Sequence, residues 1–325
     1  MLSRRHFSAG LLAGLALPGP AFGQAVDEVR RRARALRQLQ AIMVQRGDDI
    51  IVAEAPRGRG LDRSANQKSA SKSIVALLLG TAVTRGEIRI NASLREVAPR
   101  LIPANATPGA AAITLEDLVT LRAGLGSTSG GNYGAWVQSP NWVSYALRQP
   151  MFDVPGGRMI YSTGSTHILG AAITTATRKT LLQLARERLG APLKIEIPGW
   201  TRDPQGFYFG GNEMALTPRA MLRIALLMRD RGRYGETQVI PASWIDASIQ
   251  RRTQSPFSGL YYGYGWFLSE SGWILARGYG GQIIAAHQQK RLAVAIASDP
   301  AQPARSGGYF GDLMDLLEGP VTALA

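Results

Sequence analysis

The sequence predicts an α+β protein, in which an antiparallel sheet flanked by helices carries an inserted, mostly helical domain. Strand-like runs lie near both ends of the chain, and the middle is helix-rich with long loops. A chain of 325 residues, 45% of them hydrophobic, can bury a large core and fits one or two domains. We therefore expect a sheet domain from residues 25–75 and 228–325, with residues 76–227 as the helical domain.

Apolar spacing and turn residues predict the elements of the sheet domain. A first helix has Val29, Ala33 and Leu36 on its apolar side, and its solvated face carries Arg30, Arg31, Arg32, Arg34 and Arg37. Two strands, 40–45 and 50–55, are joined by a turn at 47–49. A later helix over 220–231 ends at Gly232. Four strands and a last helix follow, at residues 263–269, 273–276, 282–287, 292–298 and 311–317.

The segment Lys68-Ser69-Ala70-Ser71-Lys72-Ser73 stands directly before an apolar run, residues 74–79. Ser69 and Lys72 are three positions apart, so they share one face at the start of a buried helix. A serine hydroxyl is a weak nucleophile until a base takes its proton, and a partly buried lysine can be that base. The alternative is a helix cap at Ser69 with a solvated lysine one turn later.

Two later segments give this pair a context: Tyr161-Ser162-Thr163, and the glycine-rich run at residues 278–282. In this order the motifs resemble those of the serine β-lactamase and penicillin-binding protein superfamily. Ser-Asp-Asn and Lys-Thr-Gly are missing, so the chain is more similar to the class C branch, especially to its carboxylesterases and aminohexanoate-dimer hydrolases. Residues 113–118, 123–125 and 262–266 are also similar to that branch. The resemblance spans about residues 40 to 320 and implies a β-lactamase/transpeptidase-like fold.

The resemblance also implies roles for single residues. Ser69 is the nucleophile that becomes acylated, Lys72 is its general base, and Tyr161 relays protons to the leaving group. The backbone N–H groups of Ser69 and Gln282 form the oxyanion hole. Substrate contacts come from Thr163, Tyr279, Gly280 and Gly281. No cofactor and no metal are implied.

Two positions depart from the family pattern. Thr163 replaces an asparagine, and Tyr279 replaces a cationic or imidazole side chain. Both departures favour esters and simple linear amides over β-lactams and D-Ala-D-Ala peptides. Arg277 is expected to be a solvated residue at a strand end, with the alternative that it shares a face with Tyr279 and supplies the missing cation. Residues 124–134 are expected to be an ordinary surface loop, with a wall of the site as the alternative.

The N-terminus has the pattern of an export signal. Arg4 and Arg5 precede a short apolar stretch, residues 9–17, and a small-x-small cleavage site at residues 21–23. The arginine pair resembles a twin-arginine signal, with an ordinary secretory signal as the alternative. We expect a signal peptide over residues 1–24, a periplasmic or secreted protein, and no stable membrane anchor.

Composition and spacing exclude several other chemistries. The chain has no cysteine, which excludes disulfides and a thiol nucleophile. No histidine spacing predicts a metal site, and we expect structural roles for His167 and His287. The formal net charge of +14 is spread along the chain without a nucleic-acid motif, so nucleic acid is not an expected partner.

Together these observations predict an exported serine hydrolase that cleaves a small-molecule ester or amide through an acyl-enzyme. One alternative is a β-lactamase or D-Ala-D-Ala carboxypeptidase that uses the same residues. The other is a catalytically silent binding relative in the cell envelope. The sequence does not predict the acyl group or the oligomeric state.

Overall fold

The computed structural model describes residues 20–325. Arg4, Arg5 and most of the predicted signal peptide lie outside the described residues. The first described element is helix α1, Pro20–Ala35, which begins four residues before the end of the predicted signal at residue 24. None of the described helices combines the length and the apolar character that a membrane span requires.

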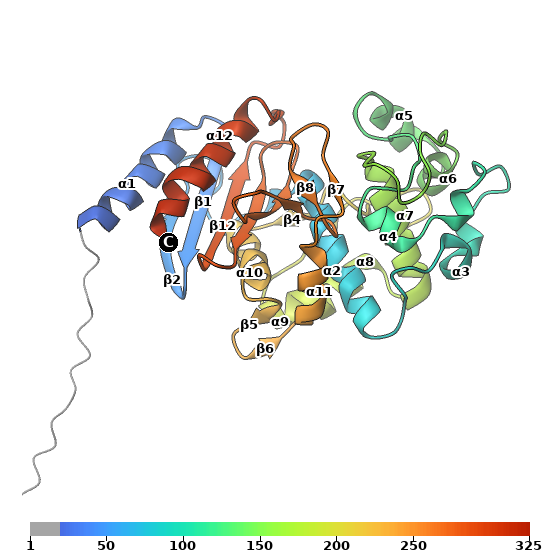
Figure 1. The fold of residues 1–325 in the computed structure, drawn as a ribbon, viewed down its shortest axis with the longest axis horizontal. Coiled ribbons are helices and arrows are strands. Elements are labelled where there is room, and N and C mark those ends of the chain that lie inside the picture. Colours follow the sequence, from blue (N-terminus) through green and yellow to red (C-terminus); the bar gives the residue numbers. More distant parts are fainter. Residues whose placement is uncertain (1–19) are drawn as a thin grey trace, which may run out of the picture.

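An eight-stranded, fully antiparallel sheet forms one half of the molecule (Figure 1), in the order β2-β1-β12-β11-β10-β9-β8-β7. Its strands are β1 Leu39–Arg46, β2 Asp49–Glu54, β7 Thr253–Gln254, β8 Tyr261–Tyr262, β9 Phe267–Leu268, β10 Ile274–Arg277, β11 Ile283–His287 and β12 Leu292–Ser298. Two small two-stranded sheets pair β3 Ala65–Asn66 with β4 Ala215–Leu216 and β5 Arg233–Tyr234 with β6 Thr237–Gln238. The first strands thus pair with the last ones, as an α+β chain with strands at both ends predicts.

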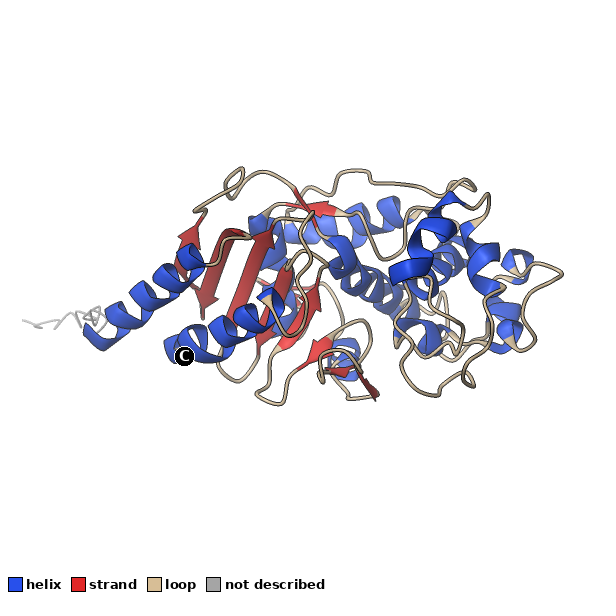
Figure 2. Ribbon diagram, turned by 90° about the horizontal axis from the view of Figure 1, so that it is seen from above, coloured by secondary structure: helices blue, strands red, loops and turns tan. Residues whose placement is uncertain are grey.

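The central strands are apolar along their whole length because both faces of the sheet are covered. On β12, Leu292, Val294 and Ile296 pack with α1 and the C-terminal helix α12, Tyr309–Leu316. The alternating alanines 293, 295 and 297 face the other side. Small side chains there let helix α10, Pro218–Arg229, pack closely on β1, β11 and β12. Figure 2 shows the helices on both sides of the sheet.

Helices α2 to α9 make up most of the other half of the molecule. They are α2 Ser71–Thr84, α3 Leu94–Val97, α4 Leu115–Val119, α5 Tyr133–Gln138, α6 Trp142–Leu147, α7 Thr163–Thr177, α8 Leu181–Ala185 and α9 Ala191–Leu193; α11, Ala242–Ser248, follows α10. Helix α2 is buried from residue 71 to residue 82 and packs against α7, α8 and β10. It therefore has no solvated face, which explains its unbroken apolar sequence.

Most predicted elements are confirmed. The first hairpin, the helix near 220–231, the strands near 273–276, 282–287 and 292–298, and the last helix all occur within two residues of their predicted bounds. The predicted strand 263–269 is confirmed only at residues 267–268, which form β9, because the chain reverses between β8 and β9, where Gly265 has φ +77°. Helix α10 crosses the predicted domain boundary at residue 227 and packs on the sheet.

Candidate active site

Ser69 lies on a short 3₁₀ helix, Lys68–Ala70, that leads directly into α2. The preceding residue, Lys68, has φ +47°, a left-handed conformation that is uncommon for a residue with a side chain. Its backbone N–H donates to Asn66 Oδ1 at 2.8 Å, and its Nζ lies 3.0 Å from Glu213 Oε1. Such backbone strain persists only where surrounding contacts hold it, and it gathers at functional sites.

Lys72 lies one turn further along and is 3% exposed. Its Nζ is 3.3 Å from Ser69 Oγ, 3.1 Å from Thr163 Oγ1 and 2.9 Å from the carbonyl oxygen of Gly211. A neutral amine has two N–H groups and one lone pair. If Thr163 and Gly211 accept the two N–H groups, the lone pair remains for the Ser69 hydroxyl, which is the arrangement of a general base.

Burial makes the neutral, unprotonated form of the Lys72 amine available near neutral pH. Desolvation lowers the pKa of Lys72 from 10.5 to about 7, because a dry site disfavours the charged ammonium. No carboxylate contacts the amine among the bonds of residues 20–325 to oppose this shift. The alternative of a helix cap with a solvated lysine is therefore wrong.

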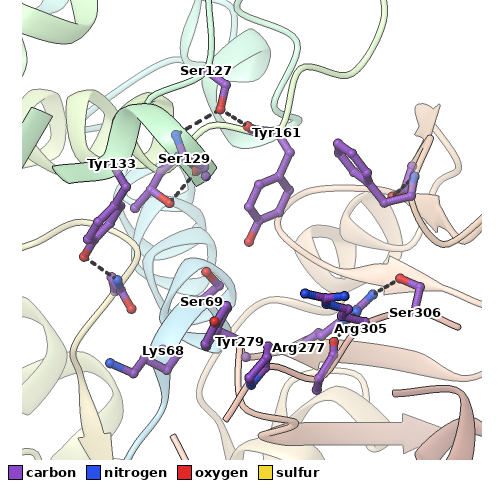
Figure 3. A pocket seen from close by; sticks show the side chains of 18 of the residues that line it. Lys68, Ser69, Ser127, Ser129, Tyr133, Tyr161, Arg277, Tyr279, Arg305 and Ser306 are labelled. Atoms are coloured by element: carbon purple, nitrogen blue, oxygen red, sulfur yellow. Dashed lines mark hydrogen bonds between the residues drawn. The ribbon is translucent and has the colours of Figure 1, made fainter. Parts of the chain in front are cut away.

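Tyr161 faces the same serine from the segment just before α7. Ser127 Oγ donates to the Tyr161 carbonyl oxygen at 2.7 Å, and Lys72 Nζ lies 5.1 Å from the centre of the tyrosine ring. Figure 3 shows the hydroxyl directed towards Ser69. Burial raises the pKa of Tyr161, while its hydrogen bond with Ser69 and the charge of Arg277 act in the opposite direction. Tyr161 is thus a protonated phenol at neutral pH, able to pass a proton on.

The three groups meet at a cavity of about 890 Å³ between the sheet and the helical half. Among the predicted site residues, Ser69, Tyr161, Thr163 and Tyr279 line this cavity. Lys72 is buried behind Ser69 and Thr163. The structure therefore brings the predicted nucleophile, base, tyrosine and threonine together from α2, α7 and the short segments that precede them.

Gln282, Gly280 and Gly281 do not line the cavity. Gln282 is fully buried, its Oε1 accepting from the N–H of Gly280 and its Nε2 donating to the carbonyl of Ser298. An added Cβ would lie 2.2 Å from the backbone oxygen of Asp299 at Gly280 and 2.5 Å from the Tyr309 ring at Gly281. These glycines allow close packing of the β10–β11 turn, and do not contact the cavity.

The end of β10 reaches the cavity instead through Gly278 and Tyr279. A Cβ at Gly278 would lie 2.6 Å from the backbone oxygen of Gln67, so glycine is needed where this strand approaches the nucleophile segment. Within residues 20–325 neither the Ser69 N–H nor the Tyr279 N–H has a hydrogen-bond acceptor. This geometry favours the Tyr279 N–H over that of Gln282 as the second oxyanion donor.

Arg277 is not the solvated strand-end residue that we expected. It lines the cavity with Tyr279, as the alternative proposed. Its guanidinium lies 3.5 Å from the centre of the Phe310 ring and donates to the Ala304 carbonyl at 2.9 Å and to Ser306 Oγ at 3.1 Å. Desolvation lowers the pKa of Arg277 to about 10, so it still carries a charge at neutral pH. Figure 3 shows Arg305 beside it.

The loop at residues 124–134 is likewise more than a connection, because it forms the opposite wall with Ser127, Ser129, Gly130 and Tyr133. Ser129 Oγ accepts from the Thr163 N–H at 2.9 Å and lies 3.0 Å from Thr163 Oγ1. It therefore fixes the threonine that contacts Lys72. The glycine- and serine-rich composition was the available signal, but it does not distinguish a site wall from a surface loop.

Two cavity residues that the sequence did not indicate come from the segment before β4. Asn212 Nδ2 donates to the Tyr133 hydroxyl at 2.9 Å, and Glu213 pairs with Lys68. No local pattern marks them, because each is defined by partners far away in the chain. Among residues 20–325, no cluster of three or more histidine, aspartate or glutamate side chains is placed to hold a metal ion.

A serine and a lysine at the start of a buried helix, faced by a tyrosine across a cavity beside an antiparallel sheet, define the class of β-lactamase-fold proteins. The sequence model of the Beta-lactamase family matches residues 41–312, and the chain belongs to this family, whose members are serine hydrolases. The search of curated proteins found no match.

Solved structures share the fold at low sequence identity. EstCE1, a hydrolase with promiscuous acyltransferase activity, is 15% identical with a TM-score of 0.75, covering 92% of this chain and 99% of its own. A penicillin-binding protein homologue from Caulobacter crescentus is 17% identical with a TM-score of 0.76, covering 94% of this chain and 98% of its own. A family VIII carboxylesterase is 18% identical with a TM-score of 0.72, and the match covers 94% of this chain and 98% of the carboxylesterase chain.

Proposed function

We propose that this protein is an exported serine hydrolase that cleaves esters or linear amides through an acyl-enzyme on Ser69. The observation that carries the proposal is the position of Lys72, whose amine is buried, has a pKa of about 7 and lies 3.3 Å from Ser69 Oγ. A catalytically silent relative has no need to keep a dry lysine beside a serine on a strained turn.

The acylation step follows from the geometry. Ser69 Oγ attacks the substrate carbonyl carbon while Lys72 takes the hydroxyl proton. The N–H groups of Ser69 and Tyr279 receive the negative oxygen of the tetrahedral intermediate. When the bond to the leaving group breaks, the proton passes through Lys72 and Tyr161 to the departing oxygen or nitrogen. A water molecule then releases the acyl group by the same sequence, with the tyrosine and lysine accepting its proton.

Esters and linear amides are favoured by the two positions that depart from the family pattern, Thr163 and Tyr279. Thr163 offers no amide to orient an acylamino group, and Tyr279, which is 56% exposed, offers a hydroxyl group in place of a cation. The carboxylesterase and EstCE1, which share this fold, are consistent with that preference.

One observation favours a second candidate, a β-lactamase or D-Ala-D-Ala carboxypeptidase. Arg277 faces the cavity and uses two of its five N–H donors on Ala304 and Ser306. The remaining donors can bind a substrate carboxylate. β-Lactams and D-Ala-D-Ala peptides both carry such a group, whereas a simple ester such as p-nitrophenyl acetate does not.

The deciding experiment compares kcat/KM for p-nitrophenyl acetate, nitrocefin and a D-Ala-D-Ala peptide. We expect the ester to give the highest value, with Ser69→Ala inactive towards all three and still folded by circular dichroism. A fluorophosphonate probe should label the wild type and not Ser69→Ala. A higher kcat/KM for nitrocefin would transfer the assignment to the second candidate, and a fully active Ser69→Ala protein would refute the nucleophile.

Export is a separate part of the proposal and rests on the sequence of residues 1–24. Replacing Arg4 and Arg5 by lysine should leave the precursor in the cytoplasm, because the twin-arginine machinery reads that pair. Fractionation of cells with an antibody against the mature chain measures this. Unchanged export of the double variant would indicate an ordinary secretory route and would leave the hydrolase assignment intact.

A further inference from the structure

His167 is fully buried on α7, one helical turn after Thr163, inside an aromatic box of Trp136, Trp142 and Phe209. The sequence predicts a structural role for it. Both of its ring nitrogens have a partner: Nε2 lies 3.0 Å from Asp203 Oδ2, and the Gly210 N–H donates to Nδ1 at 3.2 Å. Because Gly210 can only donate, Nδ1 carries no proton, and Nε2–H donates to Asp203.

The His167 imidazole thus forms hydrogen bonds with both ends of the segment 203–210. At the first end, Asp203 Oδ1 also accepts from the backbone N–H groups of Gln205 and Phe207, at 3.0 and 2.8 Å, so the carboxylate is fixed in turn. At the second end, Gly210 packs so closely on α7 that a Cβ there would lie 2.6 Å from the Thr166 carbonyl oxygen.

The next residue along this segment contacts the proposed general base. Gly211 has φ +133°, which favours glycine, and its carbonyl oxygen accepts from Lys72 Nζ at 2.9 Å. A Cβ at Gly211 would lie 3.1 Å from Lys72 Cγ. The carbonyl that takes one N–H of Lys72 therefore belongs to the residue directly after Gly210, two peptide units along the chain from the N–H that His167 holds.

We propose that His167, held by Asp203, is a positioning residue for Lys72. It fixes the backbone N–H of Gly210 and thereby the position of the adjoining Gly211, whose carbonyl holds the amine with its lone pair towards Ser69. This inference rests on the proposed function, because it assumes that Lys72 activates Ser69. Without the hydrogen bonds of His167 with Asp203 and Gly210, which we call the His167 clamp, the amine moves away from the Ser69 hydroxyl. A displacement of about 1 Å is enough to slow the transfer of the serine proton by about 10²-fold.

Two substitutions of the histidine separate positioning from simple packing. In His167→Asn the side-chain oxygen stands near the place of Nδ1 and accepts from Gly210, while the bond to Asp203 is lost. In His167→Gln the amide reaches towards Asp203, and Gly210 loses its acceptor. We expect His167→Gln to lower kcat for p-nitrophenyl acetate by about 10- to 100-fold with KM changed less than about threefold, and His167→Asn to keep most of the rate.

Asp203→Asn tests the His167 clamp without changing the imidazole ring itself. The side-chain oxygen must stay on the two backbone N–H groups, so the amide NH₂ turns towards Nε2. The ring proton then moves to Nδ1 and opposes the Gly210 N–H. This isosteric variant should reproduce the loss in His167→Gln, and it keeps the test decisive if the glutamine variant folds poorly. His287→Gln, at the other buried histidine, is the matched control and should react at the wild-type rate.

A fluorophosphonate reaction followed over time gives the readout that a purely structural role would not change. Its end point counts folded sites, and its rate constant reports activation of Ser69. A lower rate constant with a full end point supports positioning. Equal rate constants for wild type, His167→Gln and Asp203→Asn, with only the end points reduced, would overturn this inference alone. A wild type that neither hydrolyses substrate nor reacts with the probe would overturn the proposed function, and this inference with it.

Discussion

Thr163 Oγ1 lies 3.1 Å from Lys72 Nζ, at the position where the family pattern has an asparagine side chain. A hydroxyl can accept one N–H of the amine and donate to Ser129 Oγ, 3.0 Å away. The threonine therefore supplies the contact with the lysine, but it has no second group for a substrate amide. The departure from the family pattern affects substrate choice more than it affects activation of the serine.

Thr163→Val should lower kcat by about 10-fold, because a buried N–H of Lys72 loses its acceptor, at a cost of about 1–3 kcal/mol. Thr163→Ser should keep most of the activity. Thr175→Val, which removes a hydroxyl that bonds only to the helix backbone at Ala171, serves as the control on the same helix. Steady-state kinetics with p-nitrophenyl acetate measure the three variants. Full activity of Thr163→Val would show that Thr163 does not orient the lysine.

Lys72→Ala and Tyr161→Phe should each reduce kcat by about 10²- to 10⁴-fold through loss of acid–base help. The double variant should lose much less than the product of the two, since the groups act as one unit. Strictly multiplicative losses would contradict a shared proton relay. The thermal unfolding of each variant provides the control for folding.

The rate of the wild type should rise with pH and level off above about pH 7. Burial lowers the pKa of Lys72 to about 7, and only the neutral amine can accept the serine proton. The apparent pKa belongs to the coupled pair of Lys72 and Tyr161. A profile of kcat/KM from pH 5 to pH 9 measures it. A rate that is flat across this range would exclude Lys72 as the base.

Lys72→Met should be more stable than wild type at pH 6, by an amount on the order of a few kcal/mol, because the folded state holds an amine in a dry site. The folded pKa is depressed, so between about pH 7 and 10.5 the unfolded chain binds more protons, and wild-type stability rises with pH. The advantage of the variant should therefore shrink across that range. Urea unfolding at several pH values tests this, and an advantage independent of pH would mean that the amine is not desolvated.

Arg277→Met should reduce kcat/KM for a carboxylate-bearing substrate by about 10- to 100-fold, the effect of losing a hydrogen bond to a charged group. A neutral ester such as p-nitrophenyl acetate should be affected much less. Arg251→Met is the matched control, because Arg251 also stacks on an aromatic ring, that of Tyr261, but does not line the cavity. Equal losses for charged and neutral substrates would show that Arg277 only supports the fold.

The sequence indicated the parts of the site that depend on local spacing. Ser69 and Lys72 are three residues apart on one helix, so their proximity follows from helix geometry alone. The apolar run of α2 and the continuously buried strands β11 and β12 could be predicted because each is buried along its whole length. The order of the motifs then indicated a family, and the family brought Tyr161 and Thr163 to the same site.

Only the tertiary structure decided which groups face the cavity from distant parts of the chain. The glycine-rich run at residues 278–282 does not show which N–H group faces the cavity, and the packing of Gly278 against Gln67 places Tyr279 there rather than Gln282. Arg277 lies in the wall because Phe310, far away in sequence, provides a ring for its guanidinium. The hydrogen-bond partners of His167, Asp203 and Gly210, are also far away in the sequence. Such contacts depend on how separate elements pack, and no local pattern of residue types encodes that packing.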